Sequence, residues 1–217
     1  YQVMMRQQEL RRDVEATALS NNGSQADNGD AIPGVTGALD AWLVTNTSNG
    51  ATTGADGGFD SGTGLVDPYT PGDPRALSES VFKDLLQSVY EQGGESTIVM
   101  ARPALVRKFS EYQFTAGARV ATMTRETAGV SGPGSVLGAV NVYIGDFSTV
   151  EIVANRLQAP ITAGVSTMFI IEPSLLELAY LTGYRVEPIA KTGLADNRQM
   201  LVDWGLRVGN EEGLAAY

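Results

Sequence analysis

The chain opens with YQVMMRQQELRRDVEATALSNN (residues 1–22), a stretch that predicts a helix over residues 2–20. Val3, Leu10 and Val14 form a narrow apolar stripe, and charged side chains cover most of the remaining surface. Because a stripe this narrow does not bury a helix in a core, we expect the helix to lie across a surface. Its charged faces are then open to solvent or to neighbouring molecules, and a solvated surface helix is the simplest interpretation.

The clearest internal helix is ALSESVFKDLLQSVYEQGG (residues 76–94). Ser78 is placed to cap its amino end, and Leu77 and Phe82 have the spacing of a hydrophobic staple. Gly93 and Gly94 end the apolar periodicity, as expected at a helix C-terminus. Next, residues 96–101 predict a short buried strand, and Pro103 begins another helix.

The rest of the chain predicts an α+β fold, with helices and strands interspersed rather than arranged in regular β-α-β units. The alternation of apolar residues from Met200 to Val208 predicts a long strand with one buried face. Two strands are expected around Gly145–Asp146 within residues 140–157, and a buried strand over 167–173. The other expectations are strands over 38–45 (with Trp42 partly buried) and 118–125, an extended segment over 184–190, and a short helix over 174–181 closed by Gly183. Residues 46–64 are expected to form an exposed or mobile loop, and residues 126–139 a glycine-containing loop.

The composition excludes several classes of chemistry. The chain contains no cysteine and no histidine, which removes disulfides, thiol chemistry, Cys or His metal sites and every Ser–His or Cys–His nucleophile. A formal net charge of −10 argues against nucleic-acid binding as the main task. No apolar run has the length of a membrane-spanning helix. We therefore expect no cofactor, no bound metal and no membrane partner.

Two local motifs carry weak chemical signals. FDSGTG (residues 59–64) resembles the loop of an aspartic protease, but that chemistry needs two carboxylates and the chain has no second such loop. Asp60 is therefore the candidate residue of a carboxylate-dependent hydrolase, and loop composition is the simpler interpretation. Arg102, Arg107 and Lys108 form a small basic group that either pairs with an acidic neighbour or solvates one side of a helix.

Four stretches, taken together and in this order, resemble the major capsid proteins of tailed phages with the Hong Kong 97-like (Johnson) fold. The opening residues 1–22 look like the spine helix of that fold. STIVMARPALVRKFSEY (residues 96–112) looks like the strand, proline and helix of its axial domain. The other two stretches are VNVYIGDFSTVEIVANRLQAP (residues 140–160) and the terminal IAKTGLADNRQMLVDWGLRVGNEEGLAAY (residues 189–217).

This resemblance implies an α+β subunit with a peripheral domain (residues 1–76 and 186–217) and an axial domain (residues 77–185). The N-terminal arm and extended loop that precede the spine helix in this fold are expected to be missing from the sequence. The implied function is structural and not enzymatic: hexamers and pentamers form an icosahedral shell that encloses double-stranded DNA without sequence-specific contact. The implied location is the virion, with assembly in the host cytoplasm, and cement or scaffolding proteins are further partners.

The resemblance also directs attention to the charged side chains of the opening helix. Replacing Arg11 and Arg12 with Glu is expected to hinder shell formation while the subunit stays folded. Two alternatives stay open, namely an encapsulin-like compartment shell protein, which would hold protein cargo, and the carboxylate-dependent hydrolase. The candidate inter-subunit contacts are Arg6, Glu9, Arg11, Arg12, Asp13 and Glu15.

Overall fold

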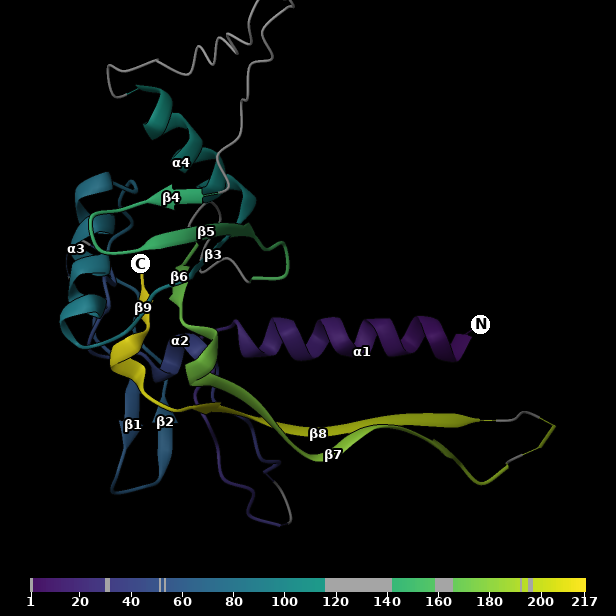
Figure 1. Cartoon of the computed structure of the whole chain (residues 1–217). Helices are drawn as coiled ribbons and strands as arrows, with labels where there is room; N and C mark the ends of the chain where they lie inside the picture. The colour runs from purple at the N-terminus through teal and green to yellow at the C-terminus, as the bar shows by residue number, and fades with distance from the viewer. Residues whose placement is uncertain are drawn as a thin grey trace, which may run out of the picture.

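Helices and strands alternate along the chain in the computed structural model (Figure 1). It describes residues 2–29, 32–50, 52, 54–115, 142–158, 166–191, 193–194 and 197–217, without the side chains of 112–115. The elements are α1 (Gln2–Ala18), α2 (Leu39–Trp42), β1 (Gly58–Asp60), β2 (Leu65–Asp67), α3 (Glu79–Glu91), β3 (Ile98–Ala101), α4 (Pro103–Thr115), β4 (Val142–Ile144), β5 (Thr149–Ala154), β6 (Met168–Ile171), η1 (Pro173–Leu175), β7 (Leu176–Pro188), β8 (Arg198–Val208), η2 (Glu211–Gly213) and β9 (Ala215–Ala216).

A five-stranded sheet of order β4-β5-β3-β6-β9 forms the centre of the body. Strand β3 runs parallel to β5 and antiparallel to β6. Helices α3 and α4 cover one face, where Phe82 is completely buried and meets Phe109 and Tyr143 edge-on, at ring separations of 4.8 and 5.2 Å. Large aromatic side chains packed in this way supply much of the free energy of a small core.

The opposite face of the sheet is covered only in part. Near β6, Phe169 and Ile171 are buried beneath α2 and the start of β7. Ile98 on β3 lies beside Ile171 and is half-buried. At the far edge, on β4, Ile144 is 80 % exposed. Burial on this face therefore decreases steadily from β6 to β4.

Strands β7 and β8 form a long antiparallel hairpin that leaves the body on the same side as α1 (Figure 1). Its root lies in the sheet, because β6 leads into β7, β8 leads into β9, and β9 pairs with β6. The pairing register shifts between Tyr180 and Thr182 and again between Thr182 and Arg185. As a result, 13 residues of β7 lie opposite 11 residues of β8.

Several expectations from the sequence are confirmed. Ser78 caps α3 by accepting a hydrogen bond from the Val81 backbone amide at 3.4 Å, and α3 ends at Glu91, just before the two glycines. Strands β3, β4, β5 and β6 lie where they were expected. Strand β8 is confirmed as well, but its apolar face is half-buried rather than buried. The expected strand over 118–125 and loop over 126–139 lie outside the described residues.

The expected strand over 38–45 is wrong, because Leu39–Trp42 forms the short helix α2. Leu39 and Leu43 are four residues apart, so one helical turn points both into the same apolar cluster. The turn also carries Asp40 into the interior, where it meets Thr167. Trp42 is half-buried, as expected, and stacks on Phe59 with 5.9 Å between ring centroids.

The expected helix over 174–181 is also wrong. Only Pro173–Leu175 forms a helical turn, and the following residues enter β7. Leu, Glu and Ala favour a helix when considered alone, but here the pairing of β7 with β8 along its whole length decides the conformation.

The polar segment 46–64, expected to be an exposed or mobile loop, has ordered parts. Gly58–Asp60 forms β1 and pairs with Leu65–Asp67. Asn46 is only 2 % exposed. Its side-chain amide donates hydrogen bonds to the carbonyls of Glu212 (2.6 Å) and Leu214 (3.2 Å), and its oxygen accepts one from the Ser88 hydroxyl. Asn46 thus fastens the C-terminal segment to α3.

Replacing Asn46 with Ala is expected to lower the free energy of unfolding of the unassembled subunit by about 3 kcal/mol, because buried carbonyls lose their donor. Urea denaturation followed by tryptophan fluorescence measures this change. The half-buried Asn49 is the control: its amide donates to the more exposed Asp56 carboxylate, so Asn49→Ala is expected to cost about 1 kcal/mol or less. Equal losses of stability for the two variants would contradict the role of Asn46 in fastening the C-terminal segment to α3.

Asp40 is a buried carboxyl group, 4 % exposed. Burial raises the pKa of Asp40 to about 7, although hydrogen bonds from Thr167 Oγ1 (3.1 Å) and from Tyr69 favour the charged form. Burial also raises the pKa of Tyr69, and the nearby Asp40 adds to that rise. Between about pH 4 and pH 7 the folded protein therefore keeps a proton that the unfolded chain releases, and stability falls as the pH rises through this window.

Asp40→Asn removes this titration and is expected to stabilise the subunit more at pH 8 than at pH 5, by about 2–3 kcal/mol. The asparagine oxygen still accepts the hydrogen bonds from Thr167 and Tyr69, so the packing is preserved. Urea denaturation of the unassembled subunit at the two pH values measures the difference. A stability change that is the same at both pH values would contradict the assignment.

Candidate subunit-contact surface

Helix α1 lies alongside the β7–β8 hairpin with most of its surface in solvent (Figure 1). Of its 17 residues, only Val14 is buried. The first turn even exposes apolar side chains, with Met4 69 % and Met5 44 % accessible. The narrow stripe expected from the sequence is therefore what the fold uses, and it touches the body only near the C-terminal end of the helix.

Four of the six charged residues predicted as contacts have partners within the subunit. Arg6 and Glu9 form an exposed ion pair on α1 itself. The Arg11 guanidinium lies 5.4 Å from the ring centroid of Tyr184 on β7, a cation–π contact that ties the helix to the hairpin. The Glu15 carboxylate accepts a hydrogen bond of 2.7 Å from the Asn155 amide, just after β5.

The other two predicted residues, Arg12 and Asp13, have no side-chain ion pair or hydrogen bond with another described residue. Both are exposed, and the Asp13 backbone carbonyl accepts a hydrogen bond of 2.7 Å from the Thr17 hydroxyl within α1. Their charges are adjacent and opposite.

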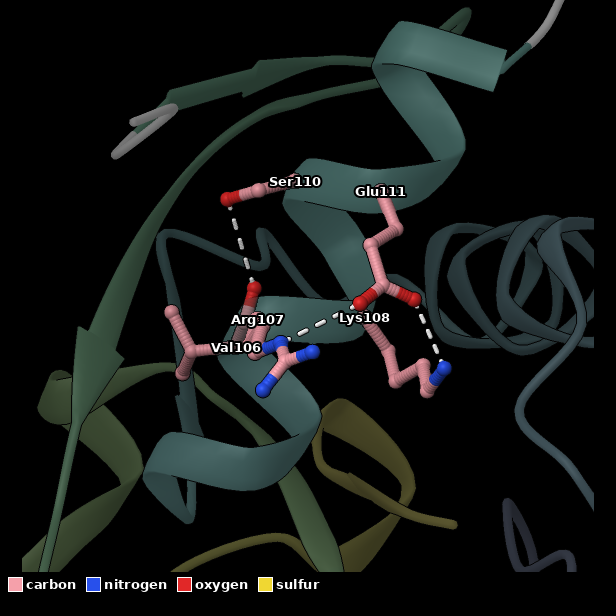
Figure 2. A network of polar contacts seen from close by, with 5 residues as sticks. All are labelled: Val106, Arg107, Lys108, Ser110 and Glu111. Carbon is pink, nitrogen blue, oxygen red and sulfur yellow. Dashed lines mark hydrogen bonds and ion pairs between the residues drawn. The ribbon is translucent and has the colours of Figure 1, made fainter. Parts of the chain in front are cut away.

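The basic group on α4 is already paired (Figure 2). Arg107 Nε lies 3.2 Å and Lys108 Nζ 2.6 Å from the two oxygens of Glu111. The hydrogen bond from Lys108 lowers the pKa of Glu111, and Arg107 adds to this effect. These side chains are largely exposed, so the pairs contribute little to stability. The structure thus favours the pairing alternative for Arg107 and Lys108.

Asp60 shows the geometry of a turn and not of a catalytic dyad. Its carboxylate accepts hydrogen bonds from the Gly62 amide (2.8 Å) and the Thr63 hydroxyl (2.9 Å), which lower its pKa. A hydrolytic acid would need the opposite shift. Within the described ranges, no group of three acidic side chains is arranged to hold a metal ion.

Exposed apolar surface is the feature that the sequence did not reveal. Val142 and Ile144 project from the edge strand β4, and Tyr90 stacks on Phe147 beside them with 5.4 Å between ring centroids. Tyr90 lies on α3 and is 55 % exposed. The sequence located strand β4 correctly, but only the packing shows that these side chains stay uncovered.

An apolar cleft opens between the end of α1, the root of the hairpin and the sheet. Its volume is about 320 Å³. It is lined by Ala18, Leu19, Leu39, Ile98, Met100, Ile171, Pro173, Leu176, Glu177, Leu178 and Leu206.

Exposed charged and apolar side chains form these surfaces. None of the described helices has the length and apolar character needed to cross a membrane.

A family model described as SU10 major capsid protein matches residues 1–217, the whole chain. No curated protein matches it. The chain therefore belongs to the SU10 major capsid protein family, and it is a structural protein of the phage virion.

Proposed function

We propose that this capsid protein adopts the Hong Kong 97-like fold and builds an icosahedral shell from hexamers and pentamers. The exposure of α1 is the observation that carries this proposal. A helix of 17 residues that buries only Val14 gains little from its own subunit, since helical stability in proteins comes mainly from packing. Contacts with neighbouring copies would supply the missing packing.

Two domains remain part of the proposal, with one adjustment. The resemblance implies a peripheral domain at 1–76 and 186–217 and an axial domain at 77–185. Residue 186 lies within β7, and strand pairing supports keeping the whole β7–β8 hairpin together with α1 in the peripheral domain. Pairing of β9 with β6 supports assigning the last residues to the axial domain.

The six charged residues of α1 remain the proposed lattice contacts, with different roles. Arg12 and Asp13 would form the outer side of α1 that meets a neighbour directly, because both are exposed and neither side chain has a partner among the described residues. Arg11 and Glu15 would hold the helix against Tyr184 and Asn155, so that it presents this outer side at a fixed angle. Arg6 and Glu9 lie in the most exposed part of the helix, where their pair could exchange partners across an interface.

The proposed shell encloses double-stranded DNA and assembles in the host cytoplasm, and cement or scaffolding proteins could reinforce it. The net charge of −10 supports an interior that does not bind DNA strongly, because phosphate contacts require clustered cations. A compartment shell with protein cargo is the alternative that this part of the proposal must exclude. Electron microscopy of purified particles tests the architecture, and nuclease-protected DNA inside them distinguishes a phage head from such a compartment.

Arg12→Glu is expected to weaken each contact made by the outer side of α1 about tenfold or more, because the new charge lies next to Asp13 and repels an acidic partner. Arg11 is left unchanged because its replacement would also remove the contact with Tyr184. Sedimentation of the assembled fraction measures the effect, and circular dichroism checks that the subunit stays folded.

Arg12→Lys is the matched control, because it keeps the positive charge at the same position. It should assemble at nearly the level of the unaltered chain. Normal assembly by Arg12→Glu would argue against a lattice contact at this position.

A further inference from the structure

The apolar cleft beside α1 has the lining of a site for an aliphatic side chain. Leu178, Leu206 and Met100 are among its walls, and its volume is about 320 Å³. Pockets for small ligands are of about this size or larger, but they add a few polar groups that orient the ligand. Here Glu177 is the one charged wall residue, and its carboxylate is bound to Arg207 at 3.0 Å.

The same chain displays suitable side chains at the far end of the hairpin. Leu194 is fully exposed and Ile189 is 46 % exposed. The Ile189 amide donates to the carbonyl of Asn197 at 3.0 Å, which helps to close the end of the hairpin. Lys191, also exposed, adds a positive charge that favours approach to a chain of net charge −10.

The hairpin end cannot reach the cleft of its own subunit. From Leu178 to Pro188, β7 rises about 30 Å at roughly 3.3 Å per residue, and Leu194 lies beyond Pro188. A contact between the two surfaces must therefore join two copies. Because the donor and acceptor surfaces differ, the contact is head-to-tail, and repetition of such contacts closes rings or extends a lattice.

The geometry points to an interaction in which the end of the β7–β8 hairpin, through Leu194 and Ile189, inserts into the cleft of a neighbouring subunit. This inference rests on the self-assembly of the capsid protein. Its occupant is a second copy of this chain, because such copies surround each subunit in a shell and carry an aliphatic side chain that matches the cleft walls.

Cysteine cross-linking tests the contact cleanly, because the chain has no cysteine of its own. In the double variant Leu178→Cys/Leu194→Cys, the two positions of one subunit are too far apart for a disulfide, so every cross-link joins two copies. Mild oxidation of purified particles is expected to produce a ladder of covalent multimers on a non-reducing gel. The control is Ile144→Cys/Leu194→Cys, which pairs the hairpin end with an exposed residue of the sheet edge.

The cross-linked fraction is expected to be about tenfold higher for the cleft pair than for the control pair, because a disulfide forms only between neighbouring Cβ atoms. Particles without the ladder, or equal ladders for both pairs, would overturn the inference while leaving shell formation intact. If the unaltered chain forms no particles, self-assembly itself fails, and the inference fails with it.

A second variant tests the energetic role of the contact. Leu194→Ser removes an apolar side chain that contributes nothing to the core of its own subunit, so the fold should be unaffected. Each contact is expected to weaken about tenfold to a hundredfold, measured as a rise in the protein concentration needed for assembly. Leu181→Ser is the control, because Leu181 is 85 % exposed but does not line the cleft. Equal assembly of the Leu194 and Leu181 variants would overturn the inference.

Discussion

The pairing of β6 with β9 is the constraint on which the shape of this subunit depends. These two strands hold both ends of the long hairpin in neighbouring positions of the central sheet. Space at this root is tight: a side chain at Gly94 would approach the Cα of Gly213 to 2.7 Å, so only glycine lets α3 and η2 meet there. Asn46 secures the same region through hydrogen bonds to Glu212 and Leu214. A projecting hairpin is marginal when isolated, and here both of its ends are held by the β6–β9 pairing.

Helices cover one face of the central sheet, whereas the opposite face is covered only in part. Helices α3 and α4 close the first face completely around Phe82, so the subunit has a core of its own. On the second face, the side chains become more exposed from Ile171 to Ile98 and then to Ile144. Exposed apolar area of this kind is expected in a protein whose working state is a lattice. The net charge of −10 opposes premature association, because copies of the same sign repel at long range.

Local signals in the sequence were sufficient to predict the elements whose conformation depends on neighbouring residues. Ser78 and the glycines after Glu91 bound α3 correctly, and the alternation from Met200 to Val208 identified β8. The sequence was misleading where contacts with distant segments determine the secondary structure. Residues 174–181 have helical propensity, yet they pair with β8. The turn at Asp40 depends on a buried partner, Thr167, far along the chain.

The same distinction applies to the contact surface. The narrow stripe of α1 predicted an exposed helix, and α1 is exposed. Nothing in the stripe showed that Arg11 lies on Tyr184 while the Arg12 side chain has no partner among the described residues, because that difference arises from where the hairpin lies. The cleft could not be predicted from the sequence for the same reason. Its walls come from α1, α2, the sheet and the hairpin, and each contributes side chains that look like ordinary core residues in the sequence.

The two register shifts in β7 have a mechanical consequence. A pair of strands with 13 residues on one side and 11 on the other bends toward the shorter strand. The backbone of the hairpin itself therefore makes it curved. The direction of the hairpin is thus determined within the subunit. Loss of the one extra residue at either irregularity would reduce this bend, while the residues beyond it would keep their partners on β8 and therefore their faces.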